Sequence, residues 1–308
     1  MIRPVVHPRV ADALAAGRPV VALESTVYSQ LGLPPGRNAE ALERCLDAIE
    51  SQGAIPAVTA LLDGVPRVGL DGDGYEKILA CEEKMAERDL PVAMAERWPA
   101  GATTVSGSLV LAHAAGIRIF ATGGIGGVHR DSAETGDVSS DLEALARYRV
   151  ATVCAGAKAF LDLPHTLERL ETLGVPVVGY GCDELPAFWS RSSGLGLPYR
   201  VDTPAEAAAI VDAMGRTGVL FTVPPPDAAA VPNTVIDTAV AEALARAEAA
   251  GITGGDVTPY VLDAIDEATE GRSVDANVEL VVNNARCAAA IARAAAIRNR
   301  PGAPLTAP

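Results

Sequence analysis

Lysine is the residue type whose scarcity in this chain first points to chemistry. Only three of the 25 basic residues are lysines, namely Lys77, Lys84 and Lys158. Arginine serves a solvated role on a surface equally well, whereas only the lysine amine can form a Schiff base with a carbonyl compound. Each lysine that remains among so many arginines is therefore a candidate for a functional role.

Lys158 is the strongest of the three candidates. It follows an apolar run in the segment CAGAKAF, and its neighbours are small. Small neighbours leave room for a ligand beside the ε-amine, and desolvation there would favour the neutral amine that attacks a carbonyl. The alternative is a lysine at a strand end that extends its amine into solvent, which is common. Lys84 is a second candidate, although its acidic neighbours could form solvated ion pairs with it, and Lys77 is expected on an exposed helix face.

A glycine-rich segment, ATGGIGGVHR at residues 121–130, follows a predicted strand. Its glycines allow a sharp turn whose backbone N–H groups form a nest for an anion, and His129 and Arg130 add donors suited to a phosphate. Loops at the carboxyl ends of strands are where open α/β sheets bind ligands. The segment matches neither the GxGxxG dinucleotide fingerprint nor the Walker loop. A tight turn without a ligand is the alternative, and we favour a site for phosphate or another small anion.

Carboxylates and carboxamides supply the remaining candidates. Glu24 follows an apolar run in VALEST and is expected at the mouth of a cleft. Asp137 and Asp141 are four residues apart, which places both on one helix face and suits a hard divalent cation with water ligands. Capping of the helix by Asp137, with Asp141 solvated, is equally compatible with this spacing. Three asparagines on an otherwise apolar helix either recognise the edge of a base or brace the helix against a loop; they are Asn277, Asn283 and Asn284.

An alternation of short apolar runs and alanine-rich stretches must position these candidates. The apolar runs predict strands that are buried on both faces of a largely parallel or mixed sheet, at residues 19–23, 117–121, 149–154, 175–180 and 218–223. The stretches between them predict helices at residues 38–51, 104–115, 137–147, 159–173, 203–215, 235–250, 256–268 and 275–297. We expect one α/β domain over residues 1–300, a three-layer α/β/α sandwich, and a disordered tail at 301–308.

The composition excludes several classes of protein. The 308 residues are 49% hydrophobic, which excludes extended disorder. A net charge of −14 argues against nucleic acids and anionic membranes as partners, because both favour a basic surface. Five widely separated cysteines predict reduced thiols, and the N-terminal residues lack the apolar core of a signal peptide. We expect no membrane-spanning helix and a cytoplasmic protein.

Eight longer motifs occur in order between about residue 8 and residue 297. They are VALEST (21–26), KMAERDLP (84–91), ATTVSGS (102–108), ATGGIGGVHR (121–130), DVSSDL (137–142), VCAGAK (153–158), VPVVGYGCDELPAFW (175–189) and NVELVVNNA (277–285). Together they resemble the pseudouridine-5′-phosphate glycosidase family, also called indigoidine synthase A-like. The resemblance implies a three-layer α/β/α fold, a homotrimer and a reaction that breaks a C-glycosidic bond at C1′ of a ribosyl 5-phosphate.

The resemblance also implies roles for the candidate residues. Lys158 would form an imine with the ring-opened sugar, and Glu24 would be the acid and base that opens the ring and moves protons. Asp141 would hold a divalent metal, usually Mn²⁺, largely through water. The residues implied to bind the phosphate, the sugar or the base are Lys84, Val105, Thr122, Gly123, Gly124, His129, Ser139 and Asn277.

The chain departs from the family pattern at positions expected to border the aglycone. The segment SQLG at 29–32 lacks the usual histidine and is one residue longer, SGS at 106–108 replaces a run of alanine and threonine, and Val223-Pro224 replaces Asn-Pro. The alternative activity is therefore a C-glycosynthase that joins ribose 5-phosphate to an aromatic polyketide in antibiotic biosynthesis. A kinase of the ribokinase type is disfavoured because the sequence has no GAGD-like motif. A non-catalytic binding module has no use for a desolvated lysine.

Overall fold

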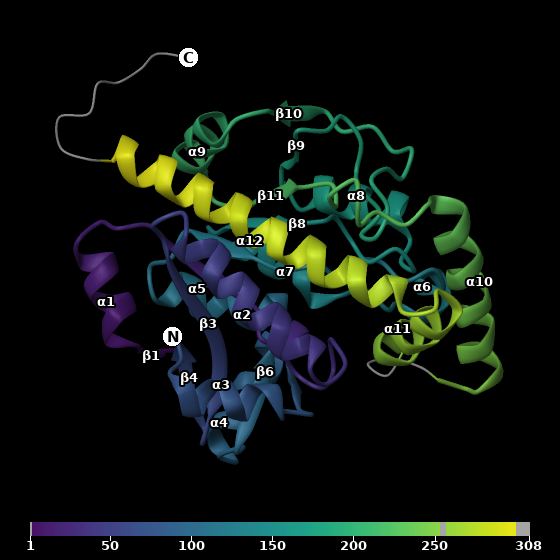
Figure 1. The fold of residues 1–308 in the computed structure, drawn as a ribbon, viewed down its shortest axis with the longest axis horizontal. Helices are drawn as coiled ribbons and strands as arrows, with labels where there is room; N and C mark the ends of the chain where they lie inside the picture. Colours follow the sequence, from purple (N-terminus) through teal and green to yellow (C-terminus); the bar gives the residue numbers. More distant parts are fainter. Residues whose placement is uncertain (1, 253–256, 300–308) are drawn as a thin grey trace.

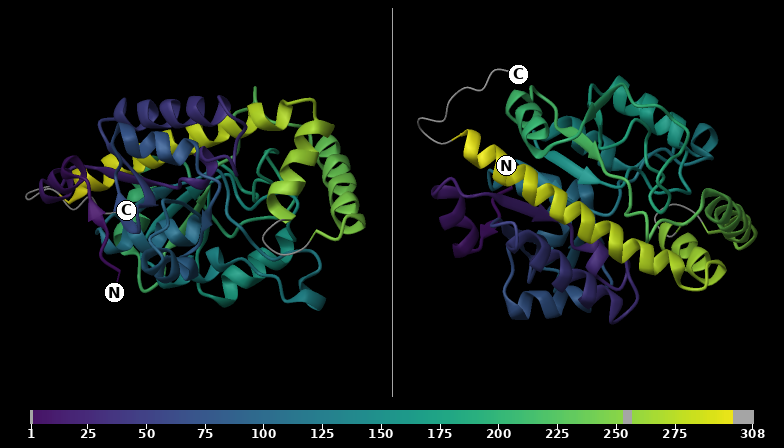
Figure 2. Two further views of the ribbon diagram at one scale, coloured as in Figure 1. Left: turned by 90° about the horizontal axis from the view of Figure 1, so that it is seen from below. Right: turned by 45° about the horizontal axis from the view of Figure 1, so that its top comes forward.

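The computed structural model describes residues 2–252 and 257–299. Its chain folds as three layers, with helices on both faces of a mixed central sheet (Figures 1 and 2). This confirms the predicted α/β/α class. The tail predicted to be disordered, residues 301–308, lies outside the described residues.

The sheet has eleven strands, and its middle is parallel. The order is β1-β4-β3-β2-β7-β8-β11-β9-β10, and β6 joins β5 to β3. Every neighbouring pair from β3 through β2 to β10 is parallel, whereas β4 and β6 run antiparallel to β3. The strands are β1 (Val5–Val6), β2 (Val20–Leu23), β3 (Ile55–Leu62), β4 (Val65–Val68), β5 (Lys84–Met85), β6 (Ala100–Thr103), β7 (Ile119–Ala121), β8 (Ala151–Cys154), β9 (Val177–Tyr180), β10 (Tyr199–Val201) and β11 (Val219–Thr222).

Two groups of helices cover the two faces of the sheet. On one face α12 (Arg272–Arg298) crosses β2, β7 and β8 and packs against α2 (Arg37–Glu50) and α9 (Pro204–Ala213) (Figure 1). On the other face α5 (Val105–Ala114) packs against α7 (Ser140–Arg147), which contacts α8 (Leu163–Thr172). The remaining helices are α1 (Pro8–Ala15), α3 (Gly72–Leu79), α4 (Leu90–Ala95), α6 (Ser132–Thr135), α10 (Asn233–Ala249) and α11 (Val257–Ala268). Figure 1 shows α10 and α11 together at one end of the molecule, beside the start of α12.

Most of the predicted elements are confirmed, with ends that differ by a few residues. The five predicted strands are β2, β7, β8, β9 and β11. The sequence does not predict β3, because Pro56 near its start is unusual in a strand that is paired on both sides. The strands β1 and β5 have two residues each and are too short to show a periodic pattern. All five cysteines are free, as predicted.

The helix predicted at 137–147 begins later than predicted. Val138 forms an isolated antiparallel bridge with Val128, so the chain at this point is extended. Ser139 is the N-cap of α7, and its hydroxyl accepts a hydrogen bond from the Asp141 amide at 3.2 Å. Asp137 therefore lies outside the helix. Both interpretations of the pair are wrong, because Asp137 neither shares a helix face with Asp141 nor caps α7.

Within residues 2–252 and 257–299, α12 is the one helix long and apolar enough to cross a membrane. Its most apolar window of 18 residues has a mean hydropathy of 1.2, and 56% of that window is buried in the fold. The expectation that no segment has these properties is wrong for α12. Its apolar face packs on the sheet and on α2 and α9 through small side chains, among them Ala285, Ala288, Ala289 and Ala292. Burial in the core accounts for the hydropathy of this helix.

The carboxyl ends of three neighbouring parallel strands lie at the same edge of the sheet. Glu24 follows β2, Thr122 and the glycine-rich loop follow β7, and the loop that carries Lys158 follows β8. In open α/β sheets this edge is where ligands bind. The parallel order β2-β7-β8 therefore brings together the residues that the sequence singles out.

Candidate functional site

A cavity of ≈ 560 Å³ lies at the carboxyl ends of β2, β7 and β8. Its volume suits a small organic ligand. Its lining includes every residue to which the family resemblance assigns a role, namely Glu24, Lys84, Val105, Thr122, Gly123, Gly124, His129, Ser139, Asp141, Lys158 and Asn277. These residues come from segments far apart in the sequence, and the fold gathers them around one space.

Glu24 is the buried acid of this cavity, with 8% of its surface exposed. Its carboxylate accepts a hydrogen bond from the Thr122 hydroxyl. Desolvation raises the pKa of Glu24 from 4.5 to about 7, and it outweighs the opposing effects of the Lys158 charge and of the Thr122 hydrogen bond. The negative charge of Asp141 raises this pKa further. A carboxyl group with a pKa near 7 can both give and take a proton at neutral pH.

Lys158 is half-buried at the end of the loop that follows β8, and its charge reaches the Glu24 carboxylate. The loop is fixed to the glycine-rich loop: the Lys158 amide donates to the Ile125 carbonyl at 3.1 Å, and the Ile125 amide donates to the Gly156 carbonyl at 3.0 Å. Gly156 has a φ of +85°, and a Cβ there would lie 2.2 Å from the Pro186 carbonyl oxygen. Only glycine fits this position. A primary amine is thus held beside an acid that titrates near neutrality.

Asp141 joins the start of α5 to the glycine-rich loop. One of its carboxylate oxygens accepts a hydrogen bond from the Ser106 amide and the other from the Gly126 amide, both at 2.9 Å. The residue is 7% exposed, so the interpretation that leaves it solvated is wrong. Asp137, the other member of the predicted pair, has its carboxylate 3.7 Å from Nδ1 of His129.

The donor set at Asp141 limits the kind of metal ion that could bind. The described residues contain no group of three or more His, Cys, Asp or Glu side chains placed to hold a metal. A carboxylate that accepts two backbone hydrogen bonds still has lone pairs available, and Asp141 lines the cavity. A hard divalent ion that keeps most of its water ligands fits one such carboxylate.

The glycine-rich loop is less of an anion nest than the sequence predicts. The amides of Ile125, Gly126 and Val128 donate to the Gly156 carbonyl, the Asp141 carboxylate and the Thr166 hydroxyl. Arg130 is also outside the lining of the cavity, because its Nε donates to a backbone carbonyl at 3.1 Å and its side chain is exposed.

The donors that do line the cavity are side chains and one helix end. His129, Ser139 and Lys84 belong to its lining, together with Ser140 in the first turn of α7. The N-terminus of a helix carries unpaired amides and a partial positive charge, so α7 favours an anion at this point.

The three asparagines of α12 have different roles. Nδ2 of Asn284 donates to the carbonyl oxygens of Thr122 at 2.9 Å and Gly123 at 3.2 Å, which braces the glycine-rich loop. Asn283 donates to a backbone carbonyl after β11 at 3.5 Å. Asn277 lines the cavity, is 7% exposed, and its Oδ1 has no protein partner in the described part of the chain. The interpretation as a brace between helix and loop is therefore confirmed for Asn284. Asn277 instead keeps its Oδ1 as an acceptor for a ligand.

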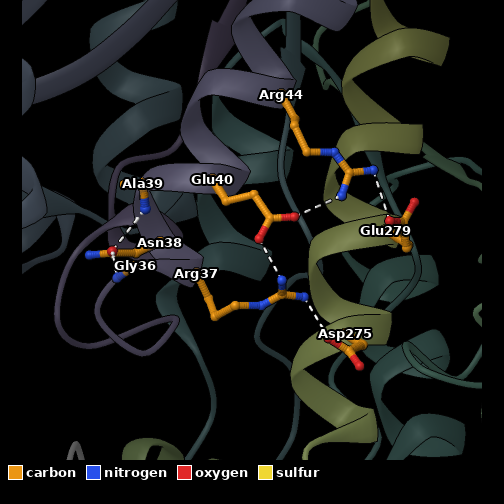
Figure 3. Close-up of polar contacts among 8 residues, drawn as sticks. All are labelled: Gly36, Arg37, Asn38, Ala39, Glu40, Arg44, Asp275 and Glu279. Atoms are coloured by element: carbon orange, nitrogen blue, oxygen red, sulfur yellow. Dashed lines mark hydrogen bonds and ion pairs between the residues drawn. The ribbon is translucent and has the colours of Figure 1, made fainter.

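A network of ion pairs joins α2 to the turn of α12 that borders the cavity (Figure 3). Arg37 pairs with Asp275 at 2.5 Å, and Arg44 pairs with Glu279 at 2.8 Å. Glu40 accepts from both arginines (Figure 3). Exposed pairs of this kind contribute little singly, but a network with two links across a helix pair fixes the register between the helices.

The sequence did not reveal the apolar part of the lining. Val27, Leu31, Leu161, Phe188 and Leu262 all line the cavity and come from four separate segments. The same residue types fill the core, so nothing in their identity marks them as ligand contacts.

Lys77 has the exposed position that the sequence predicts. Its amine pairs with the Asp63 carboxylate at 2.7 Å.

Comparison with known proteins gives consistent matches along nearly the whole chain. A family model described as indigoidine synthase A like protein matches residues 9–294. A protein of Myxococcus xanthus named pseudouridine-5′-phosphate glycosidase is 48% identical over 294 residues, which cover 92% of this chain and 95% of that protein. A protein of the same name from Paracoccus denitrificans is 47% identical over 297 residues, which cover 94% and 97%.

Two solved structures are similar to this one. The prealnumycin C-glycosynthase AlnA, in complex with ribulose 5-phosphate, superposes with a TM-score of 0.87 and 37% identity over 96% of this chain and 97% of AlnA. An indigoidine synthase A-like protein from Thermotoga maritima gives a TM-score of 0.84 and 30% identity over 94% and 96% of the two chains.

Replacement of Glu24 by glutamine is expected to stabilise the protein at alkaline pH. The carboxyl group has a pKa of 4.5 in the unfolded chain and about 7 in the folded one. The contribution of the neutral carboxyl to stability is therefore complete below pH 4.5 and is lost as the pH rises through 7. Between pH 5 and pH 8 the free energy of unfolding of Glu24→Gln should rise by about 2 kcal/mol relative to the unsubstituted protein. Denaturant unfolding at both pH values measures this difference, with Glu76→Gln on an exposed position as the control. If the free energies of unfolding of Glu24→Gln and the unsubstituted protein differ by the same amount at pH 5 and at pH 8, the assigned pKa of Glu24 is contradicted.

Proposed function

The chain belongs to the indigoidine synthase A-like family, and on this premise we propose that it makes or breaks the carbon–carbon bond between C1′ of ribose 5-phosphate and an aglycone. Relatives at 47–48% identity are named pseudouridine-5′-phosphate glycosidases, and a structural neighbour is a C-glycosynthase. The chain is accordingly a C-glycosidase-type enzyme. The proposed reaction converts pseudouridine 5′-phosphate and water into uracil and ribose 5-phosphate.

The pairing of Lys158 with Glu24 in one cavity carries the proposal. In a C-glycosidic bond the leaving group is attached through carbon, which has no lone pair that an acid could protonate. An amine bonded to C1′ supplies the missing electron pair, because it can form a carbon–nitrogen double bond as the carbon–carbon bond breaks. Two lysines line the cavity in the described part of the chain. Lys158 supports this role because it is half-buried and its charge acts on the acid that titrates near pH 7, whereas Lys84 is exposed.

In the cleavage direction, Glu24 begins as the acid, and the amine of Lys158 attacks in its unprotonated form. Glu24 gives its proton to the ring oxygen as the amine bonds to C1′, so that the bond between C1′ and the ring oxygen breaks. The ammonium nitrogen then returns a proton to Glu24. Glu24 delivers that proton to the aglycone carbon that was bonded to C1′ as the carbon–carbon bond breaks. In the same step the nitrogen lone pair forms the iminium with C1′. Water adds to C1′ and releases the aldehyde of ribose 5-phosphate, and the proton left on Lys158 returns to Glu24.

The remaining residues of the site are proposed to bind and orient the substrate. His129, Ser139 and the first turn of α7 hold the phosphate, because they offer donors and the positive end of a helix. Thr122 keeps Glu24 in place through its hydroxyl. The rim residue Lys84 contacts the sugar, and Asn277 contacts the base.

We propose that Asp141 holds a divalent ion, Mn²⁺ by resemblance to the family. Such an ion, when bound, supplies positive charge that orients substrate oxygens and their water shell. The amides of Ser106 and Gly126 fix the direction of the carboxylate that would hold it. A homotrimer in the cytoplasm is proposed on the family resemblance alone.

A C-glycosynthase that uses an aromatic polyketide is the second candidate. The likeness to AlnA favours it, as do the two apolar side chains, Val27 and Leu31, that the loop after β2 contributes to the cavity. An antibiotic pathway would be its setting. Incubation of the protein with ribose 5-phosphate and either uracil or a hydroxylated aromatic polyketide distinguishes the two by the product formed.

The role of Lys158 is tested by the turnover of pseudouridine 5′-phosphate. Lys158→Arg keeps a positive charge but cannot form an imine, and we expect it to lower kcat by at least about a thousandfold. Lys77→Arg, on the surface, is the matched control and should retain full activity. Release of uracil measured by chromatography gives the rate. Retention of activity in Lys158→Arg would exclude the imine.

The role of Asp141 is tested by Mn²⁺ binding itself. Titration followed by the electron paramagnetic resonance signal of free Mn²⁺ should give one site per chain, and Asp141→Asn should weaken it at least about tenfold. Glu143→Gln, which lies in the same helix and pairs with Arg169, should bind Mn²⁺ like the unsubstituted protein. Thermal unfolding of each variant checks that Asp141→Asn is folded. Equal Mn²⁺ affinity in a folded Asp141→Asn protein would contradict the assignment.

A further inference from the structure

Phe188 has a backbone conformation that is rare for a bulky residue. It lies in the loop after β9 with a φ of +58°, in the left-handed region. Its amide donates to the carbonyl of Ala155 at 3.0 Å, and its ring packs edge-to-face on Trp189 with centroids 4.8 Å apart. Such a conformation persists only where the surrounding structure enforces it, and it is concentrated at functional sites. The loop thereby holds the ring of Phe188 at the wall of the cavity, where the residue is 3% exposed.

The ring of Phe188 lies on the first two glycines of the glycine-rich loop. A Cβ on Gly124 would lie 2.6 Å from Cδ2 and 2.7 Å from Cε2 of this ring. A Cβ on Gly123 would lie 3.6 Å from Cε2 of Phe188 and 3.5 Å from Oδ1 of Asn277. The aromatic ring and the partnerless carboxamide oxygen therefore border the same short stretch of backbone.

The far end of the same loop has a different environment. A Cβ on Gly126 would lie 2.3 Å from Oγ of Ser139 and 3.0 Å from Oδ2 of Asp141, both at the start of α7. His129 follows three residues later and lines the cavity. The loop thus runs from an aromatic and amide end to a polar end, where His129 and the Ser139 hydroxyl offer donors beside the Asp141 carboxylate.

The two ends of the loop orient a ribosyl 5-phosphate in the cavity. C1′ and C4′ flank the ring oxygen, and C4′ carries C5′ and the phosphate, so C1′ lies several bonds from a phosphate that the α7 end would hold and can reach the start of the loop. Thr122 stands at that start, and its hydroxyl bonds to the Glu24 carboxylate, the proposed acid at C1′. A group attached to C1′ then extends over Gly123 and Gly124 to the ring of Phe188.

We infer that the part of the Phe188 ring that reaches the cavity is the contact for the aglycone ring, so that Phe188 is a specificity-determining residue for planar aromatic aglycones. This inference rests on the proposed function. An aromatic contact, edge-to-face or offset, is compatible with uracil and with a larger aromatic ring. Asn277 accepts from an N–H or O–H group at the edge of that ring.

The synthesis direction tests the inference, because its two substrates have separate KM values. With uracil and ribose 5-phosphate as substrates, Phe188→Leu should raise the KM of uracil about tenfold, as expected for the loss of one aromatic–aromatic contact. The KM of ribose 5-phosphate should change less than twofold. Phe188→Tyr retains the ring and should keep the KM of uracil, and Phe221→Leu in the buried strand β11 controls for a general effect of a lost core ring.

Phe188→Asn provides a second variant whose side chain tolerates the left-handed backbone and lacks the ring. It should raise the KM of uracil about tenfold, as Phe188→Leu does. It therefore tests the inference even where the leucine variant does not fold. A parallel rise in both KM values, or an unchanged KM of uracil in an active variant, overturns the inference while leaving the proposed function intact. An unsubstituted protein that forms no product from either aglycone overturns the proposed function and this inference with it.

Discussion

The burial of one carboxyl group, that of Glu24, is the constraint on which the rest of the site depends. The carboxylate stands at the end of β2 with 8% of its surface exposed, and desolvation brings its pKa to about 7. A buried charge is costly unless it is compensated, and here the compensation comes from the next two strands of the sheet. Thr122 after β7 gives a hydrogen bond, and Lys158 after β8 gives a positive charge. The parallel order β2-β7-β8 therefore brings an acid with a pKa near 7 and a lysine side chain to one cavity.

The loops that carry these groups are held by contacts that also exclude other backbone arrangements. Asp141 binds the amides of Ser106 and Gly126, and Asn284 of α12 binds two carbonyls at the start of the glycine-rich loop. Gly156 allows the loop after β8 to approach the segment around Phe188. Helices on both faces of the sheet thus fix the same loop, one through a carboxylate and the other through a carboxamide. Such preorganisation lowers the cost of ordering the site when substrate binds.

The sequence predicts the fold class and the polar residues of the site well, for a physical reason. Strands buried on both faces are continuous apolar runs, and a charged residue directly after such a run is expected at a cleft, which identifies Glu24. Lys158 is identified by the scarcity of lysine and by its small neighbours. The start of α7 could not be predicted, because a tertiary bridge between Val128 and Val138 keeps the chain extended where the helical pattern had already begun. The amides of the glycine-rich loop were assigned to an anion because the sequence does not show that Asp141 and other protein groups accept from them. Phe188 was missed because a residue that lines a cavity and a residue that fills a core have the same composition.

In the proposed mechanism Lys158 forms an imine with ribose 5-phosphate, and covalent trapping detects this bond. The protein is incubated with ribose 5-phosphate, reduced with borohydride and digested, and the peptides are analysed by mass spectrometry. A reduced pentose phosphate is expected on Lys158, and no adduct at this position in Lys158→Arg. An unmodified Lys158 in protein that turns over substrate would contradict the proposed imine.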